Sequence, residues 1–499
     1  MITDIAGGFS EFLKIWNLAF IALGVAIGIV FGAIPGLNAI IGVALVLPFT
    51  FYMAPSTAMC LMIGLYKGGV YSGSIPAILL NIPGAPEAAA TAADGHALAS
   101  QGKAGKALRM SIHASFIGGI VSDLLLILVA AQLAKVALRV GPPEMFGLLV
   151  FALTIIGAVS GTSLAKGVIA GLFGLFVASI GMDVVTGVSR FTFGYFELSG
   201  GIPFLPMLMG MFALSEIFIQ TERVATETGR INRVTSDDPR DSRLSWGEFK
   251  PCLPTIFRSS AIGALIGAIP GPGATTSAFV SYAMARHMSK HPEKMGKGSL
   301  EGVAAPDAGN NATCSATLIP LFTLGIPGSP IAAVIAGALM IHGINPGPLI
   351  FQNSATLVYG FYFGMVTASI LVFVFGFLAI RYAVRAVEVP RTVLFPVITA
   401  LCYAGTYANS SSVFDLGVMT AFGVLGYLMR KGGLSVPAFV IAFLLGPTME
   451  NAFKQALLIG DGSFQIFLTS PIAMGFFILT IISAFLVHRQ RSRLKKLRF

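Results

Sequence analysis

The chain has 499 residues, of which 55% are hydrophobic and only 11% are charged. About a quarter of the residues in soluble domains are charged, so this composition excludes an ordinary water-soluble globule. The formal net charge is +10, and residues 488–499 alone hold six Lys and Arg and no acidic residue. Because this basic tail directly follows an apolar segment, it indicates a cytoplasmic anchor and argues against nucleic-acid binding.

Several site types are absent from the sequence. The four cysteines stand far apart, with no C-x-x-C motif, so neither a disulfide framework nor a zinc site is indicated. We find no phosphate-binding loop, no catalytic Ser/His/Asp spacing and no cluster of metal ligands. The N-terminus has no basic region and no small-residue cleavage site, so we expect no removable signal peptide. The sequence therefore predicts neither an enzyme nor a bound cofactor.

Apolar segments follow one another along the chain. In the first half we expect them at about 17–35, 37–54, 56–81, 86–100, 110–134, 145–164, 167–188 and 201–220. In the second half we expect them at about 259–270, 272–285, 308–325, 331–345, 354–380, 391–407, 413–429, 434–449 and 464–487. The long polar stretch between the halves, 222–258, mixes seven basic and six acidic residues and is predicted to be a charged cytoplasmic linker.

Two signatures occur twice, in the same order. GAIPG stands at 32–36 and again at 267–271, with glycine at every fourth position before it. An Ile-Pro, five residues and then Ile-Pro-Gly-x-Pro stand at 75–86 and again at 319–330. The second copy lies 235 residues after the first for GAIPG and 244 residues after it for Ile-Pro-Gly-x-Pro. Two ordered pairs at nearly constant offset indicate an internal duplication.

The basic residues predict how the two copies are oriented. In the first copy Lys103, Lys106 and Arg109 follow the second signature. In the second copy the basic residues lie between the signatures: Arg286, Lys290, Lys294 and Lys297. Equivalent loops with opposite charge bias should face opposite sides of the membrane, which is typical of inverted-topology repeats.

The number of residues available predicts a hairpin and a broken helix in each copy. Only about 13 residues separate Arg258 from Gly271, too few to cross a bilayer, so the chain should turn back near 270–273. The equivalent hairpin tip lies near 35–36, and the broken helices are expected near 82–86 and 326–330. We therefore predict an all-α polytopic membrane protein with repeat 1 at 1–221, the linker at 222–258, repeat 2 at 259–450, and an extra transmembrane helix with the basic tail at 451–499.

These breaks are the predicted binding site. Proline removes an N–H and glycine leaves helical φ and ψ, so the freed backbone groups must line an enclosed cavity. Helix N-termini suit a carboxylate and unwound carbonyls suit a sodium ion. The predicted substrate-binding residues are Pro35, Gly36, Asn38, Ser72, Ser74, Asn81, Pro83, Gly84, Pro270, Gly271, Gly273, Thr275, Thr276, Asn310, Asn311, Pro327, Gly328 and Ser329. The predicted cation-binding residues are Gly36, Asn81, Gly271, Asn311, Ser315 and Gly325. The alternative is that the glycines and prolines only permit tight packing and kinks.

A few ionisable residues stand in or beside the apolar segments. Lys67 and Asp123 are functional candidates for that reason; Lys67 either pairs with a substrate carboxylate or extends to the interface. Asp307 is either functional or an N-terminal helix cap. Asp94 is expected near the cytoplasmic surface.

Longer motifs resemble a known family. GAIPGLNA, SGSIPAILLNIPGAPEAAATAADGHAL, AAPDAGNNA and LIPLFTLGIPGSPIAAVIAGALMIHGINPGP are similar to the large membrane subunit of tripartite tricarboxylate transporters, the TctA family, over nearly the whole chain. The resemblance implies a bacterial inner-membrane carrier that works with a small four-helix membrane subunit and a periplasmic solute-binding protein. It implies uptake of citrate or another organic carboxylate driven by an ion gradient, without ATP hydrolysis.

The leading hypothesis is thus a subunit of a secondary active transporter, with a sodium ion or proton as the coupling ion. By analogy with other hairpin-and-broken-helix architectures, we expect an elevator-like movement of the hairpin-bearing part. The alternative function is a passive anion channel, which would conduct without ion coupling. A polytopic membrane enzyme would need an acid/base or metal constellation that the sequence does not offer.

Overall fold

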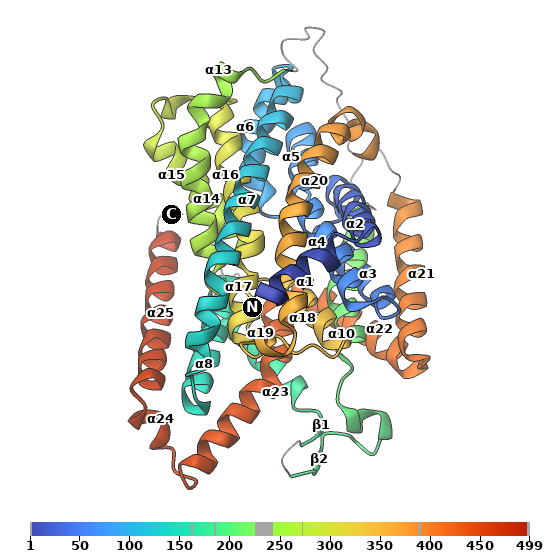
Figure 1. The fold of residues 1–499 in the computed structure, drawn as a ribbon, viewed down its shortest axis with the longest axis vertical. Helices are drawn as coiled ribbons and strands as arrows, with labels where there is room; N and C mark the ends of the chain where they lie inside the picture. The colour runs from blue at the N-terminus through green and yellow to red at the C-terminus, as the bar shows by residue number, and fades with distance from the viewer. Residues whose placement is uncertain are drawn as a thin grey trace.

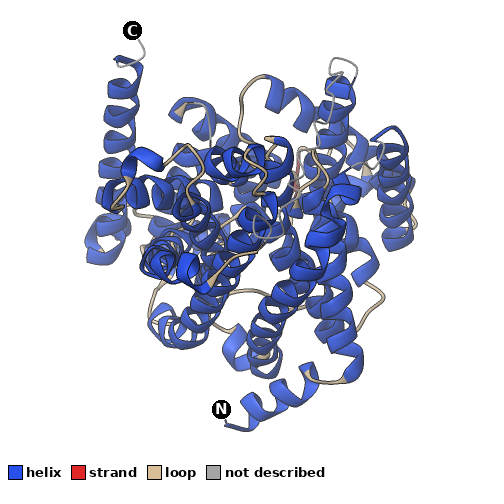
Figure 2. Cartoon of the chain, turned by 90° about the horizontal axis from the view of Figure 1, so that it is seen from above, coloured by secondary structure: helices blue, strands red, loops and turns tan. Residues whose placement is uncertain are grey.

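The computed structural model describes residues 2–160, 163–183, 186–224, 243–271, 273–387 and 391–496. These parts of the chain are almost entirely helical (Figures 1 and 2). The two strands described, β1 (Gly181–Met182) and β2 (Ser189–Arg190), form a small antiparallel ribbon in which Gly181 pairs with Arg190. The predicted all-α class is therefore confirmed apart from this ribbon.

The helices of the first half follow the predicted segments closely. They are α1 (Ile2–Phe12), α2 (Ile15–Ala33), α3 (Ala39–Thr50), α4 (Pro55–Ser72), α5 (Ser74–Leu80), α6 (Ala88–Ser100), α7 (Ala104–Ala137), α8 (Pro142–Ser160), α9 (Leu164–Ala178), η1 (Phe196–Gly200), α10 (Phe204–Met209), the π-helical turn η2 (Gly210–Leu214) and α11 (Ser215–Val224).

The second half repeats this order of short and long helices. It contains α13 (Trp246–Phe249), η3 (Lys250–Cys252), α14 (Leu253–Gly267), α15 (Gly273–Met288), η4 (Pro292–Lys294), α16 (Leu300–Ala316), α17 (Leu318–Leu324), α18 (Pro330–Ile341), α19 (Ile350–Asn353), α20 (Ala355–Val387), α21 (Arg391–Ser410), α22 (Val413–Lys431), α23 (Val436–Ile459), α24 (Ile466–Thr469) and α25 (Pro471–Lys496). The predicted division at residue 450 lies inside α23, and the extra C-terminal helix is α25.

Within the described residues, six helical segments are long and apolar enough to cross a membrane. They are Ile15–Ala33, Ala104–Ala137, Phe204–Glu222, Ala355–Ile380, Val413–Lys431 and Val436–Ile459. The protein is therefore a multi-pass membrane protein. The first of these segments is α2, which was predicted to be one arm of a re-entrant hairpin; its 19 residues are enough to span a bilayer. The matching helix α14 has 15 residues.

The regularly spaced glycines bring helices into close backbone contact. A Cβ atom at Gly28 of α2 would collide with the carbonyl oxygen of Leu65 in α4, and a Cβ at Gly263 of α14 would collide with that of Gly309 in α16. The two glycines, Gly28 and Gly263, are 235 residues apart in sequence, and the residues they contact, Leu65 and Gly309, are 244 apart. These are the same offsets as those of the two repeated signatures. For Gly28 and Gly263, tight helix packing is thus the physical reason for glycine.

One end of the molecule gathers α6, α13 and the loop between α15 and α16, near the top of Figure 1. There Gln101 Nε2 donates to the carbonyl of Lys297 at 2.9 Å, and Lys106 Nζ lies 2.6 Å from Glu248 Oε1. Although desolvation acts in the opposite direction, hydrogen bonds from Lys106 and Ser245 lower the pKa of Glu248 to about 2. Most of the predicted linker, 225–242, lies outside the described residues, as do 497–499 of the basic tail.

Asp94 holds this end together. Its carboxylate accepts hydrogen bonds from the Tyr282 hydroxyl at 2.8 Å and from the backbone N–H groups of Gly296, Gly298 and Ser299 at 2.7 to 2.9 Å. Asp94 is fully buried at this end of the molecule. Its side chain on α6 fixes the loop between α15 and α16, so the two halves of the chain are joined here by charge-assisted hydrogen bonds.

Candidate functional site

In each copy of the signature, the first Ile-Pro lies in the first turn of a short helix. The chain leaves α4 at Gly73 and continues as α5, with Pro76 in its first turn; it leaves α16 at Thr317 and continues as α17, with Pro320 in its first turn. Proline has no N–H to donate to the preceding turn, so the helix is already interrupted at Gly73 and at Thr317, before the predicted breaks at 82–86 and 326–330. Both short helices have seven residues.

The short helices end in the left-handed conformation at equivalent residues. Asn81 has φ of 55° and Gly325 has φ of 74°. The following backbone N–H of Ile82 donates to the carbonyl of Pro76 at 3.3 Å, and that of Ile326 to the carbonyl of Pro320 at 3.2 Å. Each of these bonds reaches back six residues across the left-handed residue and turns the chain sharply out of the short helix.

The Ile-Pro-Gly-x-Pro segments then fold back on the interruption before them. The N–H of Gly84 donates to the carbonyl of Gly73 at 3.1 Å, and the N–H of Gly328 donates to the carbonyl of Thr317 at 3.2 Å. α6 and α18 begin after these segments. Both predicted helix breaks are thus present, and they share one backbone hydrogen-bond pattern.

The tip between α14 and α15 meets the second break. The N–H of Gly271 donates to the carbonyl of Gly328 at 3.3 Å. Gly271 has φ of +112°, and a Cβ there would lie 2.9 Å from the backbone of Ile156. This contact joins one predicted tip to one predicted break. Two other residues of the predicted tip are Pro270, which is half-buried, and Gly273, which has φ of +63°. Residue 272 lies outside the described residues.

The tip between α2 and α3 has different neighbours. Gly36 has φ of +93°, and a Cβ there would meet the side chain of Gln220 in α11. The buried Pro35 precedes it. The first break instead approaches α2 through Gly84, whose added Cβ would lie 2.5 Å from the carbonyl oxygen of Gly32.

The two breaks differ in accessibility. At the first break Asn81 and Ile82 are exposed, Ile82 by 43%, and Pro83 is half-buried. At the second break Pro327, Gly328 and Ser329 are buried. The first break also touches the second hairpin, because the Thr275 hydroxyl lies 3.4 Å from Glu87 Oε2. Thr276 beside it is half-buried.

Several predicted polar residues satisfy the backbone of their own surroundings. Asn38 accepts from the N–H of Ile41 and caps α3, and Ser329 accepts from the N–H of Ala332 and caps α18. Ser72 donates to the carbonyl of Gly28 at 3.1 Å. These side chains therefore have a structural role, either capping a helix or bonding to a neighbouring helix, that competes with ligand binding.

A buried ion pair lies among α4, α7, α16 and α20. Lys67 Nζ is 2.7 Å from Asp123 Oδ1, and the two side chains are 3% and 0% exposed. Ser315 donates to Oδ1 of the same carboxylate and Ser369 donates to Oδ2, the latter at 2.7 Å. Lys67 therefore neither extends to the interface nor offers an unpaired charge, and Ser315 is engaged by Asp123.

A second buried carboxylate, Asp307, has only hydroxyl partners among the described residues. Ser74 and Thr91 both donate to its Oδ1, at 2.7 and 2.6 Å. Asp307 is the eighth residue of α16, which begins at Leu300 rather than near 308, so the capping interpretation was wrong. Asn311 donates to the Ser115 hydroxyl at 2.9 Å, while both amide atoms of the buried Asn310 have no hydrogen-bond partner.

Sequence reasoning missed the residues that face these two carboxylates from other helices. Thr91 and Ser369 were not predicted to belong to the site, and neither was Ser115, which accepts a hydrogen bond from Asn311 and contacts neither carboxylate. Isolated serines and threonines in apolar helices usually bond to a carbonyl of their own helix. A sequence pattern therefore carried no signal for these contacts.

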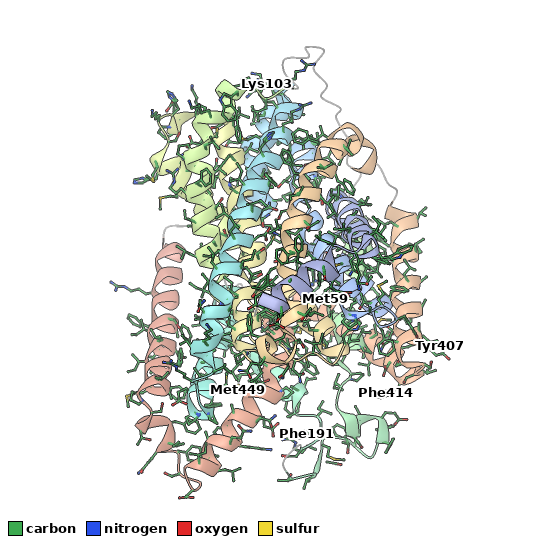
Figure 3. All side chains as sticks on the ribbon, in the orientation of Figure 1. Met59, Lys103, Phe191, Tyr407, Phe414 and Met449 are labelled. Atoms are coloured by element: carbon green, nitrogen blue, oxygen red, sulfur yellow. The ribbon has the colours of Figure 1, made fainter. Side chains whose placement is uncertain are left out.

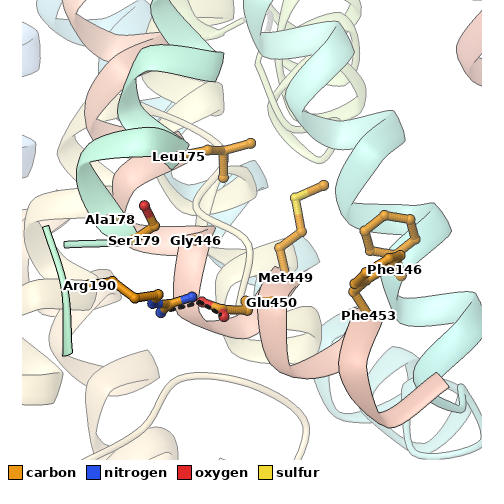
Figure 4. Close-up of a pocket in the computed structure, with 9 residues that line it drawn as sticks. All are labelled: Phe146, Leu175, Ala178, Ser179, Arg190, Gly446, Met449, Glu450 and Phe453. Carbon is orange, nitrogen blue, oxygen red and sulfur yellow. Dashed lines mark hydrogen bonds and ion pairs between the residues drawn. The ribbon is translucent and has the colours of Figure 1, made fainter. Parts of the chain in front are cut away.

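Two pockets lie at the opposite end from Lys103, which Figure 3 labels at the top. One pocket of about 360 Å³ is lined by Phe146, Leu175, Arg190 and Glu450 among others (Figure 4). The other, of about 280 Å³, adds Lys454 and Asn451. Arg190 donates to both carboxylate oxygens of Glu450, and Lys454 pairs with Asp183 and Glu450. The charges in these pockets are thus paired, and neither pocket includes a predicted site residue.

Comparisons with known proteins identify one relative over nearly the full length of the chain and another over less than half of it. A protein of Agrobacterium vitis described as an uncharacterized 52.8 kDa protein in the TAR-I ttuC′ 3′ region is 35% identical over 473 residues, 95% of this chain and 93% of that protein. Another A. vitis protein, described as lying in the TAR-II ttuC′ 3′ region, is 34% identical over 227 residues, 45% of this chain and 94% of that protein. No solved structure matches the chain.

A protein-family model also matches most of the chain. The model of the tripartite tricarboxylate transporter TctA family matches residues 18–441. This range includes both copies of the repeated signatures, both helix breaks and the two buried carboxylates described above. The chain therefore belongs to the tripartite tricarboxylate transporter TctA family.

Proposed function

We propose that this chain is the large transmembrane subunit of a binding-protein-dependent secondary active transporter that imports a tricarboxylate or another organic carboxylate. A sodium or proton gradient drives uptake. The observation that carries this proposal is the pair of equivalent helix breaks, with the tip at Gly271 bonded to Gly328 in the second. Broken helices place free backbone groups inside a membrane protein, where they serve a ligand.

The positions of equivalent loops support inverted-topology repeats. Gln101, after α6, contacts Lys297, in the loop between α15 and α16, at the end where Figure 3 labels Lys103. In the first half the corresponding loop between α3 and α4 contains Tyr52, which donates to the carbonyl of Ala408. The neighbouring Tyr407 lies toward the lower end in Figure 3. Equivalent loops at opposite ends are what inverted repeats require.

The basic residues support the orientation. The loop that holds Lys290, Lys294 and Lys297 lies with Lys103 at one end, which we assign to the cytoplasm together with the C-terminus. Arg190, which this scheme places outside, is neutralised by Glu450. The charge rule counts basic residues rather than net charge, so Lys135, Arg139 and Arg190 outside still count against this orientation. The proposed location is the bacterial inner membrane.

The substrate binds between the breaks and tips in this proposal. The N-termini of α6 and α18 direct partial positive charge and N–H groups toward the breaks, and a carboxylate accepts hydrogen bonds there. The carbonyls at Gly36, Asn81, Gly271 and Gly325, with Asn311 and Ser315, remain the proposed cation ligands. The accessible first break and buried second break are consistent with a carrier that opens to one side at a time, by an elevator-like movement against the remaining helices.

The partners in this proposal are a small four-helix membrane subunit and a periplasmic solute-binding protein that delivers the carboxylate. Counterflow tests the carrier mechanism. Proteoliposomes that contain both membrane subunits are loaded with unlabelled citrate, and labelled citrate with the binding protein is added outside without an ion gradient. A carrier produces a transient accumulation of label. Citrate conductance without accumulation would instead establish an anion channel.

A further inference from the structure

Asp307 is a buried carboxylate whose charge is not matched by a basic side chain. It is 1% exposed, and within the described chain no Lys or Arg forms an ion pair with it. Asp123, the other carboxylate in this core, has Lys67 at 2.7 Å. Removing an ionised carboxylate from water without a partner is strongly unfavourable. Asp307 therefore needs a cation or a proton.

The hydrogen bonds on Asp307 favour its ionised form. Ser74 and Thr91 both donate to Oδ1, which leaves Oδ2 with no hydrogen-bond partner. Hydrogen bonds donated to a carboxylate stabilise the charged state. A proton on Oδ2 would remove the charge that these two hydroxyls stabilise. A metal cation would keep it.

Unpartnered polar atoms surround the same position. The buried Ser111 hydroxyl on α7 lies near the Asp307 carboxylate and forms no hydrogen bond with a described residue. Asn310, one helical turn further along α16, is 1% exposed, and its side-chain oxygen and nitrogen have no partner. Nearly all buried polar groups in proteins have hydrogen-bond partners, so a cluster of exceptions points to a missing ligand. Apart from the Asn310 nitrogen these atoms are oxygens, which suit a hard cation.

We propose that Asp307, with the hydroxyl of Ser111 and the oxygens of Ser74 and Thr91, binds a sodium ion. This site is separate from the cation ligands proposed at the helix breaks. Its role rests on the proposed function, because the bound sodium ion is the coupling ion only if the chain is a transporter. The site draws on α5, α6, α7 and α16.

The position of the site explains how sodium binding is coupled to carboxylate binding. Ser74 is the first residue of α5 and Thr91 lies in the first turn of α6, so these two side chains flank the first break. A sodium ion at Asp307 neutralises the carboxylate and holds both helices against α16. The N-terminus of α6 is then fixed in position for an anionic substrate.

Sodium binding is measured on the purified chain in detergent, independently of transport. Thermal unfolding is followed as NaCl replaces choline chloride at constant ionic strength. We expect a saturable rise in Tm for the wild type, none for Asp307→Asn, and a midpoint shifted by about tenfold or more for Ser111→Ala. Asp415→Asn, at another buried aspartate, is the matched control and should keep the wild-type response.

The inference is overturned if sodium leaves the wild-type Tm unchanged, if Asp307→Asn responds as the wild type does, or if Tm responds only to pH. Uptake measured in parallel separates this from the proposed function. Gradient-driven carboxylate uptake without sodium stabilisation would reject the site and keep the transporter. Sodium stabilisation that depends on Asp307, in a chain that moves no carboxylate with its partners, would keep the site and reject the transporter.

Discussion

The ammonium of Lys67 lies 2.7 Å from Oδ1 of Asp123, and both side chains are buried. The hydroxyls of Ser315 and Ser369 donate hydrogen bonds to the same carboxylate. The ion pair therefore connects helices from both halves of the chain. Lys67 is thus a structural partner of Asp123 in this conformation, and a substrate carboxylate would have to displace Asp123 to reach it.

Replacing one partner should destabilise the protein strongly. Lys67→Met leaves Asp123 as an uncompensated buried charge, and breaking such a pair costs about 3–5 kcal/mol. The double variant Lys67→Met with Asp123→Asn should recover much of this loss, because no charge remains buried. Thermal unfolding in detergent measures both effects. Lys106→Met, which removes a partly exposed pair with Glu248, is the control and should cost about 1 kcal/mol or less. Equal losses in the single and double variants would contradict the assignment.

The glycines at the tip and the break should not tolerate a larger side chain. Gly271 has a positive φ, and a Cβ at Gly328 would lie 2.8 Å from the carbonyl oxygen of Thr317. Gly271→Val and Gly328→Val should each abolish carboxylate uptake while the protein still inserts, as judged by its amount in the membrane fraction. Gly417→Val, at a helical position with open space around it, should transport normally. Normal uptake by both test variants would remove the argument that the breaks form the site.

Labelling from each side of the membrane tests the inverted topology. Cysteines at Ala104 and Ser289 should react only from the cytoplasmic side, because Ala104 follows Lys103 and Ser289 begins the loop between α15 and α16 that Gln101 contacts. A cysteine at Phe193, which is 80% exposed and near Phe191 at the other end, should react only from the periplasm. The four native cysteines are buried and give little background. Reaction of Ala104→Cys and Ser289→Cys from opposite sides would refute the inverted arrangement.

The contacts of Asp94 should hold the loop between α15 and α16 in place. Asp94→Asn replaces an acceptor oxygen by an amide group and leaves buried donors such as the Gly298 N–H without a partner, at a cost of about 1–3 kcal/mol. Hydrogen exchange at residues 296–299 should become faster, with little change in α23. Unchanged exchange in this loop would show that Asp94 does not restrain it.

The sequence predicted features that are determined locally. The Ile-Pro and Ile-Pro-Gly-x-Pro signatures predicted both helix breaks because proline and glycine act on the backbone next to them. The first residues of α16 were missed because Pro306 lies inside that helix and its early turns are not strongly apolar. A proline within an apolar helix is tolerated when neighbouring groups satisfy the freed carbonyl.

The partners of the buried carboxylates depend on contacts between distant parts of the chain. Asp307 is bonded to Ser74 and Thr91, more than 200 positions earlier in the chain. A single sequence contains no pattern that connects such residues. Lys67 and Asp123 were recognised as unusual because each is charged within an apolar segment, but only the packing of α4 against α7, α16 and α20 shows that they pair.

Uptake of labelled citrate into proteoliposomes tests the proposed function most directly. The vesicles contain this chain and its small membrane subunit, and uptake is measured with and without the binding protein under an imposed sodium or proton gradient. We predict accumulation that requires both the binding protein and the sodium gradient. Accumulation of another carboxylate under the same two requirements would keep the mechanism and change the substrate. Flux that needs neither the binding protein nor a gradient would contradict the account.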